Sequence, residues 1–229
     1  MLKIKNLSVK YISTNTKVIK NISFDVKKGE VIAILGSSGC GKTTLLNVVQ
    51  GLLDNDVAYI TGEVLIQKET RVNTVFQEPR LLPWKNVLKN IVYAIESKNI
   101  DTKKASVLAT EILKKVKLND YTEYLPAQLS LGMQQRVNFA RAIVCSPDLL
   151  LMDEPFSALD SKTKNEIIKE FKKIISENKL TTIFVTHDIK EALNLATRVF
   201  VMDYEFKEVK KDQIISDFIK EANSFRGAS

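Results

Sequence analysis

The sequence predicts an α/β fold with a parallel-sheet core, an N-terminal antiparallel β region and an inserted helical subdomain. Apolar residues alternate with polar ones through the first 26 positions, which is typical of half-buried strands. Short, continuous apolar runs occur on both sides of the middle of the chain, as strands buried in a parallel sheet require. Between them, from Asn86 to Cys145, the apolar residues follow the helical period of 3.6.

The first part of the chain contains the predicted β region and one helix. Apolar positions alternate in the segments Leu2–Val9 and Val18–Val26, and the polar turn between them predicts antiparallel strands. Val31–Leu35 is apolar throughout, which predicts a strand buried on both faces. The segment Lys42–Gln50 predicts a helix that follows a glycine-rich loop and ends at a glycine.

The middle of the chain predicts three amphipathic helices. The residues expected on their buried faces are Val87, Ile91 and Ile95; Val107, Ile112 and Val116; and Val137, Ala140 and Val144. We therefore expect one domain, residues 1–229, in which residues 1–77 and 146–229 form the α/β core. Residues 78–145 then form the helical subdomain.

Strand and helix alternate again after the helical subdomain. Leu149–Met152, Thr181–Val185 and Arg198–Met202 predict strands, and residues 161–178 predict a helix between the first two. A strand, a helix and a further strand in sequence indicate a parallel sheet. The segment Asp212–Phe225 predicts a closing amphipathic helix.

Composition and charge indicate where the chain is located and which partners it is expected to bind. The chain has no apolar run near the ~20 residues that cross a bilayer, no signal-peptide pattern, and two cysteines too far apart to indicate a disulfide framework, so a cytoplasmic location is expected. The net charge of +7 raises the alternative of nucleic-acid binding. Most of the basic residues are scattered lysines, however, which favours a solvated surface.

A glycine-rich loop carries the first chemical signal. Residues 36–43 match the phosphate-binding pattern G-x-x-x-x-G-K-[ST] between a buried strand and a helix, which predicts a P-loop NTPase with a RecA-like core. Lys42 should bridge the β- and γ-phosphates of ATP, and Thr43 should bind Mg²⁺. A chance glycine-rich turn is the alternative. The residues expected around the nucleotide are Gly36, Ser37, Ser38, Gly39, Cys40, Gly41, Lys42, Thr43 and Thr44.

Cys40 lies inside this loop, near a helix N-terminus and Lys42. Both features favour the thiolate, so we expect a reactive cysteine that MgATP protects.

Two carboxylates end the apolar strand Leu149–Met152. Asp153 should therefore lie at the carboxyl edge of a parallel sheet, where it can bind Mg²⁺. Glu154 follows it and could polarise a water for attack on the γ-phosphate. The alternative is a pair of solvated side chains at a strand end.

A second possible anion site precedes the last helix of the helical subdomain. Ser130 offers a hydroxyl and Gly132 a backbone N–H at the start of that helix. Because the phosphate loop already supplies one nucleotide site, this second site suggests contact with the ATP of a partner chain.

Together these motifs resemble the nucleotide-binding subunit of ABC transporters. The resemblance rests on the phosphate loop, Gln77 after a strand, the signature 129–134, the strand ending in Glu154, Ser157-Ala-Leu-Asp160 and His187. It implies a homodimer that holds two ATP molecules head to tail, with Ser130, Gly132 and Gln134 at the partner's nucleotide. It also implies that Gln77 touches Mg²⁺ and water, and that Asp160 links the two sites.

The resemblance assigns roles to two further residues, and the sequence departs from the family signature at one position. His187 resembles the switch histidine that contacts the γ-phosphate, and Tyr11 matches the aromatic residue that stacks on adenine; a structural histidine and an ordinary strand tyrosine are the alternatives. Leu131 stands where the family signature has glycine. We expect a negative φ there, because leucine would be strained at a positive φ.

The segment 77–84 points to a membrane partner. It places Trp84 in a proline-restricted loop, which suggests the lip of a groove for a membrane subunit rather than core packing. The segment also resembles importers of nitrate, sulfonates, taurine and thiamine-precursor pyrimidines.

We therefore expect an importer ATPase that uses ATP and Mg²⁺ at the cytoplasmic face of the membrane. Its expected partners are two membrane-spanning permease subunits and, indirectly, a solute-binding protein, with no nucleic acid. The alternative is a non-transport ABC ATPase that acts on DNA or the ribosome, but those usually carry a long coiled coil that is not found between Thr43 and Ser130.

Overall fold

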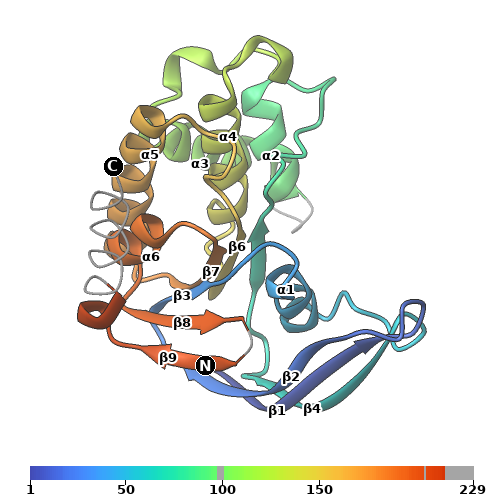
Figure 1. The fold of residues 1–229 in the computed structure, drawn as a ribbon. Coiled ribbons are helices and arrows are strands. Elements are labelled where there is room, and N and C mark those ends of the chain that lie inside the picture. The colour runs from blue at the N-terminus through green and yellow to red at the C-terminus, as the bar shows by residue number, and fades with distance from the viewer. Residues whose placement is uncertain (97–100, 204, 215–229) are drawn as a thin grey trace. The chain divides into compact units, whose positions relative to one another are not determined.

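The structure is a computed structural model that describes residues 1–96, 101–203 and 205–214. The chain divides into two compact units. Residues 1–66 and the described residues from 185 onward form the first unit, and residues 67–184 form the second. Figure 1 labels the elements of both units. Most of the predicted closing helix Asp212–Phe225 lies outside the described residues.

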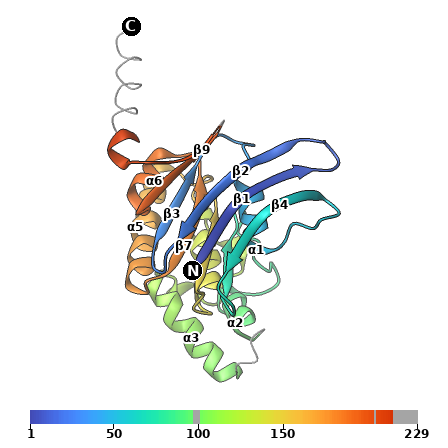
Figure 2. The same ribbon diagram turned by 90° about the horizontal axis from the view of Figure 1, so that it is seen from below.

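The first unit contains a three-stranded antiparallel sheet in the order β2-β1-β4. β1 (Leu2–Tyr11) pairs with β2 (Lys17–Val26) on one side and with β4 (Ala58–Ile66) on the other, as Figure 2 shows. The predicted antiparallel pair is thus confirmed. The sequence did not predict β4, because Tyr59 and Leu65 are exposed and leave it with a weak apolar alternation.

The pairing of β1 with β4 contains a bulge. The register jumps between Lys5 and Ser8, where Asn6 has a φ of 49° and Gly62 on β4 has a φ of 95°. Lys5 forms an ion pair with Glu63 at 2.8 Å beside this bulge.

The other strands of the first unit carry the phosphate loop. β3 (Val31–Leu35) pairs in parallel with β8 (Arg198–Met202), which pairs antiparallel with β9 (Phe206–Val209). Residues of β3 from Val31 to Ile34 are buried, as predicted for a strand covered on both faces. The unit also contains the helices α1 (Lys42–Gln50) and α6 (Ile189–Leu195).

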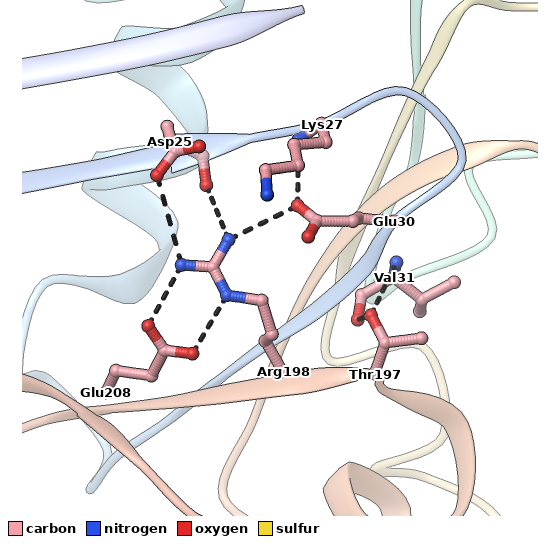
Figure 3. Close-up of polar contacts among 7 residues, drawn as sticks. All are labelled: Asp25, Lys27, Glu30, Val31, Thr197, Arg198 and Glu208. Carbon is pink, nitrogen blue, oxygen red and sulfur yellow. Dashed lines mark hydrogen bonds and ion pairs between the residues drawn. The ribbon is translucent and has the colours of Figure 1, made fainter.

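Arg198 ties the strands of the first unit together at the end of β3 away from the loop. Figure 3 shows its guanidinium between Asp25, Glu30 and Glu208. Arg198 donates to both carboxylate oxygens of Glu208 at 2.9 Å and to Glu30 at 3.2 Å. These contacts connect β2, the turn before β3, β8 and β9, and they raise the pKa of Arg198.

The second unit contains parallel strands and most of the helices. Its strands follow the order β5-β6-β7, with β5 paired in parallel to β6, and β7 begins in this unit. Two short 3₁₀ turns lie between the helices. The elements are β5 (Val72–Val75), α2 (Val87–Glu96), α3 (Thr102–Lys115), η1 (Asn119–Tyr121), η2 (Pro126–Gln128), α4 (Leu131–Ile143), β6 (Leu149–Asp153), α5 (Ser161–Glu177) and β7 (Thr181–Thr186).

The predicted helix faces are largely correct. Val87, Ile91 and Ile95 of α2 are all buried. In α3 the predicted Ile112 is buried and so is Val116 after it, but Val107 is 59% exposed, and Ala105 and Ala109 lie on the buried face. Alanine carries too weak an apolar signal to reveal that face from periodicity.

The predicted fold class is confirmed: parallel strands, a separate antiparallel region and a run of helices. The division into an α/β core of residues 1–77 and 146–229 and a helical subdomain of residues 78–145 stays a prediction. Among the residues that the structure describes, none of the helices has the length and apolarity to cross a membrane.

Candidate active site

The phosphate loop leaves β3 and enters α1 through left-handed glycines. Gly39 has a φ of 81° and Gly41 a φ of 106°, a region that residues with a Cβ rarely adopt. Gly41 is the N-cap residue of α1, so the loop leads directly into the N-terminus of that helix. This backbone fits a phosphate group, because the N–H groups and the helix dipole both favour an anion.

Lys42 lies inside the loop. Its Nζ donates to the carbonyl oxygens of Gly36 at 2.9 Å and Ser37 at 2.8 Å, and the residue is 4% exposed. The next residue, Thr43, is exposed at the start of α1. The loop therefore holds an ammonium group and presents a hydroxyl, which fit the phosphates and the Mg²⁺ of MgATP.

Other parts of the first unit hold the loop in place. Ser37 Oγ donates to Asp203 in the turn after β8 at 2.7 Å. The backbone N–H of Gly36 donates to the carbonyl oxygen of Thr186 at 3.2 Å. The loop is thus tied to the ends of β7 and β8 within the same unit.

The expectation of a reactive thiolate at Cys40 is wrong. Burial raises the pKa of the Cys40 thiol, and the opposing effect of Lys42 is smaller. Removing the thiol from water disfavours its charged form, and the neighbouring ammonium does not offset that cost.

Tyr11 ends β1 beside the helix that follows the phosphate loop. Its Oη lies 3.1 Å from Thr44 Oγ1. The structure thus brings two of the predicted nucleotide-binding residues together. Stacking of Tyr11 on adenine stays a prediction.

His187 is exposed directly after β7, and its neighbours are fixed by a buried pair. Thr186 Oγ1 donates to the carboxylate of Glu191 at 2.5 Å, and it accepts the N–H of Asp188 at 3.0 Å. Glu191, on α6, is 2% exposed. Thr186, before His187, is therefore anchored to a buried carboxylate, and Asp188, after it, is anchored to Thr186.

The second unit gathers the predicted carboxylates and Gln77. Asp153 is the last residue of β6, and Glu154 follows with a φ of 41°. The left-handed backbone at Glu154 turns the chain sharply where the strand ends.

Ser157 connects this turn to Gln77. Gln77 Nε2 donates to Ser157 Oγ at 3.3 Å, and Ser157 Oγ donates to the carbonyl oxygen of Glu154 at 3.0 Å. Motif spacing assigns no separate role to Ser157, which here links two of the predicted catalytic residues.

The signature lies at the start of α4. Ser130 is exposed and caps the helix by accepting the N–H of Met133 at 3.3 Å. Leu131 begins the helix with a negative φ, as expected. Gln134 Nε2 donates to the carbonyl oxygens of Pro126 and Leu129, so its side chain stabilises the preceding turn.

Asp160 caps the neighbouring helix α5. Its side chain accepts the N–H groups of Lys162 and Thr163, each at 3.1 Å. The hydrogen bonds with Thr163 lower the pKa of Asp160. The carboxylate is therefore charged at neutral pH, and its predicted link between two nucleotide sites stays a prediction.

The predicted residues fall into two sets. The first unit carries Tyr11, the phosphate loop and His187, and the second carries Gln77, Ser130, Gly132, Gln134, Asp153, Glu154 and Asp160. Sequence reasoning missed Glu191, Ser157 and the buried amides of α4. Their signal is weak, because the burial and partners of a polar residue, whether in a helix or in a turn, become evident only in three dimensions.

Comparison with known proteins identifies similar proteins of one family. A family model described as ABC transporter matches residues 19–157. The spermidine/putrescine import ATP-binding protein PotA of Fusobacterium nucleatum is 36% identical over 226 residues, which cover 92% of this chain and 60% of that protein. An uncharacterized ABC transporter ATP-binding protein of Methanocaldococcus jannaschii is 40% identical over 210 residues, covering 88% of this chain and 77% of that protein.

A further relative and a solved structure agree. PotA of Borreliella afzelii is 38% identical over 244 residues, which cover 99% of this chain and 70% of that protein. A dimeric ATP-binding cassette in a post-hydrolysis state, bound to ADP and Pi, superposes with a TM-score of 0.78 at 31% identity. That match covers 92% of this chain and 99% of the solved one.

Proposed function

Because the chain belongs to the ABC transporter family and is one of its ATP-binding ATPase domains, we propose that it is the ATP-hydrolysing subunit of an importer. The observation that carries this proposal is the phosphate loop of β3 and α1, with its inward Lys42, in a chain that also presents Ser130 at a second helix start. The importer assignment is further supported by two relatives whose names describe import.

The residues present suggest a division of labour in hydrolysis. Bound Mg²⁺ supplies positive charge that stabilises the developing charge on the phosphates. We propose that Thr43 and Asp153 hold it, since a hydroxyl and a carboxylate are the oxygen ligands that Mg²⁺ prefers. Glu154 acts as general base toward the attacking water. Gln77 would contact the Mg²⁺ and that water, and His187 would contact the γ-phosphate and orient the water.

We propose that two copies of the chain enclose two ATP molecules. The support is the exposed Ser130 at the N-terminus of α4, a helix start that can receive a phosphate. A solved relative that is dimeric and bound to ADP and Pi is a further support for a dimer. In the proposed dimer the helix start at Ser130 and Gly132 faces the partner's nucleotide, Gln134 supports it by holding the preceding turn, and Asp160 links the two sites.

The test pairs Glu154→Gln with Ser130→Arg. Glutamine keeps the size of the side chain but cannot accept a proton, so kcat should fall ~10²-fold or more while ATP binding survives and an ATP-bound dimer persists in gel filtration. Ser130→Arg should abolish that dimer and leave ATP binding to the monomer intact. Asp153→Asn should instead weaken Mg²⁺-dependent ATP binding. Wild-type hydrolysis by Glu154→Gln, or an unaltered dimer of Ser130→Arg, would refute the proposal.

We also propose that the chain works beneath two permease subunits at the cytoplasmic face of the membrane. Trp84 is 73% exposed and Tyr93 is 53% exposed, both in the second unit, so core packing does not account for them. Large exposed aromatic side chains are typical anchors in protein interfaces. Trp84→Ala should reduce recovery of the chain with permease-containing membranes, whereas Leu52→Ala, at a site 60% exposed in the first unit, should not.

For the solute, we propose the nitrate, sulfonate, taurine or thiamine-precursor class that the segment 77–84 suggests. Two relatives carry names that describe spermidine and putrescine import, so polyamines are the competing class. The test is a thermal-melting screen of the solute-binding protein that operates with this transporter, using both solute classes. A rise in melting temperature with polyamines alone would refute the proposed class.

A further inference from the structure

One face of α4 binds the backbone of the segment that carries Gln77. Gln135 Nε2 donates to the carbonyl oxygen of Gln77 at 2.7 Å, and Asn138 Nδ2 donates to the carbonyl oxygen of Phe76 at 2.9 Å. A spacing of three places both amides on one side of the helix. Residues 76 and 77 are therefore fastened to α4 rather than forming an independent loop.

The same face continues one turn further along the helix. Arg141 donates to the carbonyl oxygen of Pro79 at 2.8 Å and to that of Arg80 at 2.9 Å. Burial lowers the pKa of Arg141, as expected for a guanidinium withdrawn from water. Three side chains of α4 thus hold four carbonyl groups of the segment 76–80.

The side-chain amides of Gln135 and Asn138 are buried and have lost their contact with water. Gln135 and Asn138 are each 1% exposed. Asn138 Nδ2 also donates to Gln135 Oε1 at 3.2 Å, which fixes the orientation of one amide by the other. Burying an amide N–H group without a hydrogen bond is costly, so each NH₂ group keeps its backbone acceptor in one place.

We propose that Gln135 and Asn138 are positioning residues for the proposed ATPase reaction, holding the main chain at Phe76 and Gln77 so that the Gln77 side chain meets Mg²⁺ and the attacking water. This inference rests on the proposed function of Gln77. Because α4 also begins with the signature at Ser130, one helix carries the signature and holds the backbone of Gln77, so the two move together. Engagement of the partner's ATP by the signature then acts directly on the placement of Gln77.

The test combines single variants with a double-mutant cycle in the purified full chain. Gln135→Met and Asn138→Ala each remove one donor, and each should lower kcat ~10-fold or more, because a displacement of about 1 Å at a positioning group has such effects. The KM for ATP should stay within about twofold. In the Gln77→Ala background, either change should lower kcat less than about twofold further, since the positioned side chain is already missing.

Asn73→Val is the matched control. Asn73 Nδ2 donates to the carbonyl oxygen of Ala142, so this variant removes a side-chain hydrogen bond to α4 without touching the segment 76–80. It should keep wild-type kcat. Melting temperatures of all variants show which are folded, and the two single variants serve as substitutes for each other if one fails to fold.

The outcomes distinguish a failure of the positioning role from a failure of the proposed role of Gln77. Wild-type kcat in the folded single variants, or full additivity with Gln77→Ala, would overturn the positioning role while leaving Gln77 in place. Wild-type kcat in Gln77→Ala would overturn the proposed role of Gln77, and the inference with it.

Discussion

The most quantitative prediction concerns the contact between the first turns of α4 and α5. A Cβ added at Gly132 would lie 2.7 Å from Thr163 Cγ2 and 3.3 Å from Ile167 Cδ1. The methyl of Thr163 is attached to a stiff β-branched side chain, and a separation of 2.7 Å is far shorter than an ordinary carbon–carbon contact of ~3.5–4.0 Å. Gly132→Ala must therefore push the two helix starts apart.

The expected cost follows from two opposing effects. Overpacking of this kind destabilises by about 1–3 kcal/mol, and replacing a helical glycine by alanine gains up to about 1 kcal/mol. The free energy of unfolding should therefore fall by roughly 1 kcal/mol, where an uncrowded helical site would show a rise.

A second substitution tests whether the crowded methyl is the cause. Thr163→Ser removes Cγ2 and keeps the hydroxyl that bonds with Asp160, so it should cost about 0.8 kcal/mol alone. Combined with Gly132→Ala it should restore near-wild-type stability, because the alanine methyl occupies the vacated space. Thr163→Val keeps the methyl and should give no rescue.

The assay is urea denaturation at 25 °C followed by two optical probes, to check that unfolding is two-state. Stabilisation by Gly132→Ala alone, or additivity with Thr163→Ser, would refute the packing argument.

Three further predictions concern the first unit. Alkylation of Cys40 by maleimide should rise with pH through a midpoint above the ordinary thiol value of ~8.5, and MgATP should slow it; a lower midpoint would contradict the effect of burial. The hydrogen bonds from Arg198 lower the pKa of Glu208, so the wild-type chain should have a higher free energy of unfolding than Glu208→Gln above pH ~4.3 and lose that excess as the pH falls through the lowered pKa. The excess should stay below about 1 kcal/mol, because the pair is partly exposed. Denaturation at pH 7 and pH 3 measures it. Thr186→Val should lower kcat with little change in KM for ATP, because the anchor to Glu191 is lost, whereas Thr186→Ser should retain activity; equal loss in both would count against the anchor.

The sequence predicted the elements whose signal is local. The run Val31–Leu35 and the glycines after it specify a buried strand and a tight loop, and the structure contains both. Strand β4 was not predicted because the apolar residues Tyr59 and Leu65 lie exposed on it and blur the alternation. In the α3 segment only Val107 was misplaced, because the buried Ala105 and Ala109 carry little hydrophobic signal.

The site shows the same limit. Motif spacing identified the residues expected to touch nucleotide, but the residues that hold them are recognised only by the contacts they make in the folded chain. Glu191 and Asn138 have no distinguishing spacing, and their roles depend on which backbone groups the fold brings to them. Such partners could not be predicted from a single sequence, because burial of a polar group is a tertiary property.

The bulge between β1 and β4 bears on how this chain avoids aggregation. β4 is an outer strand of its sheet, and a long flat outer strand can recruit another molecule through its unpaired N–H and C=O groups. The left-handed Gly62 interrupts the regular spacing of those groups, and the charged Glu63 follows at once. A second molecule therefore meets a kinked, charged template here, which discourages edge-to-edge polymerisation while the subunit awaits assembly.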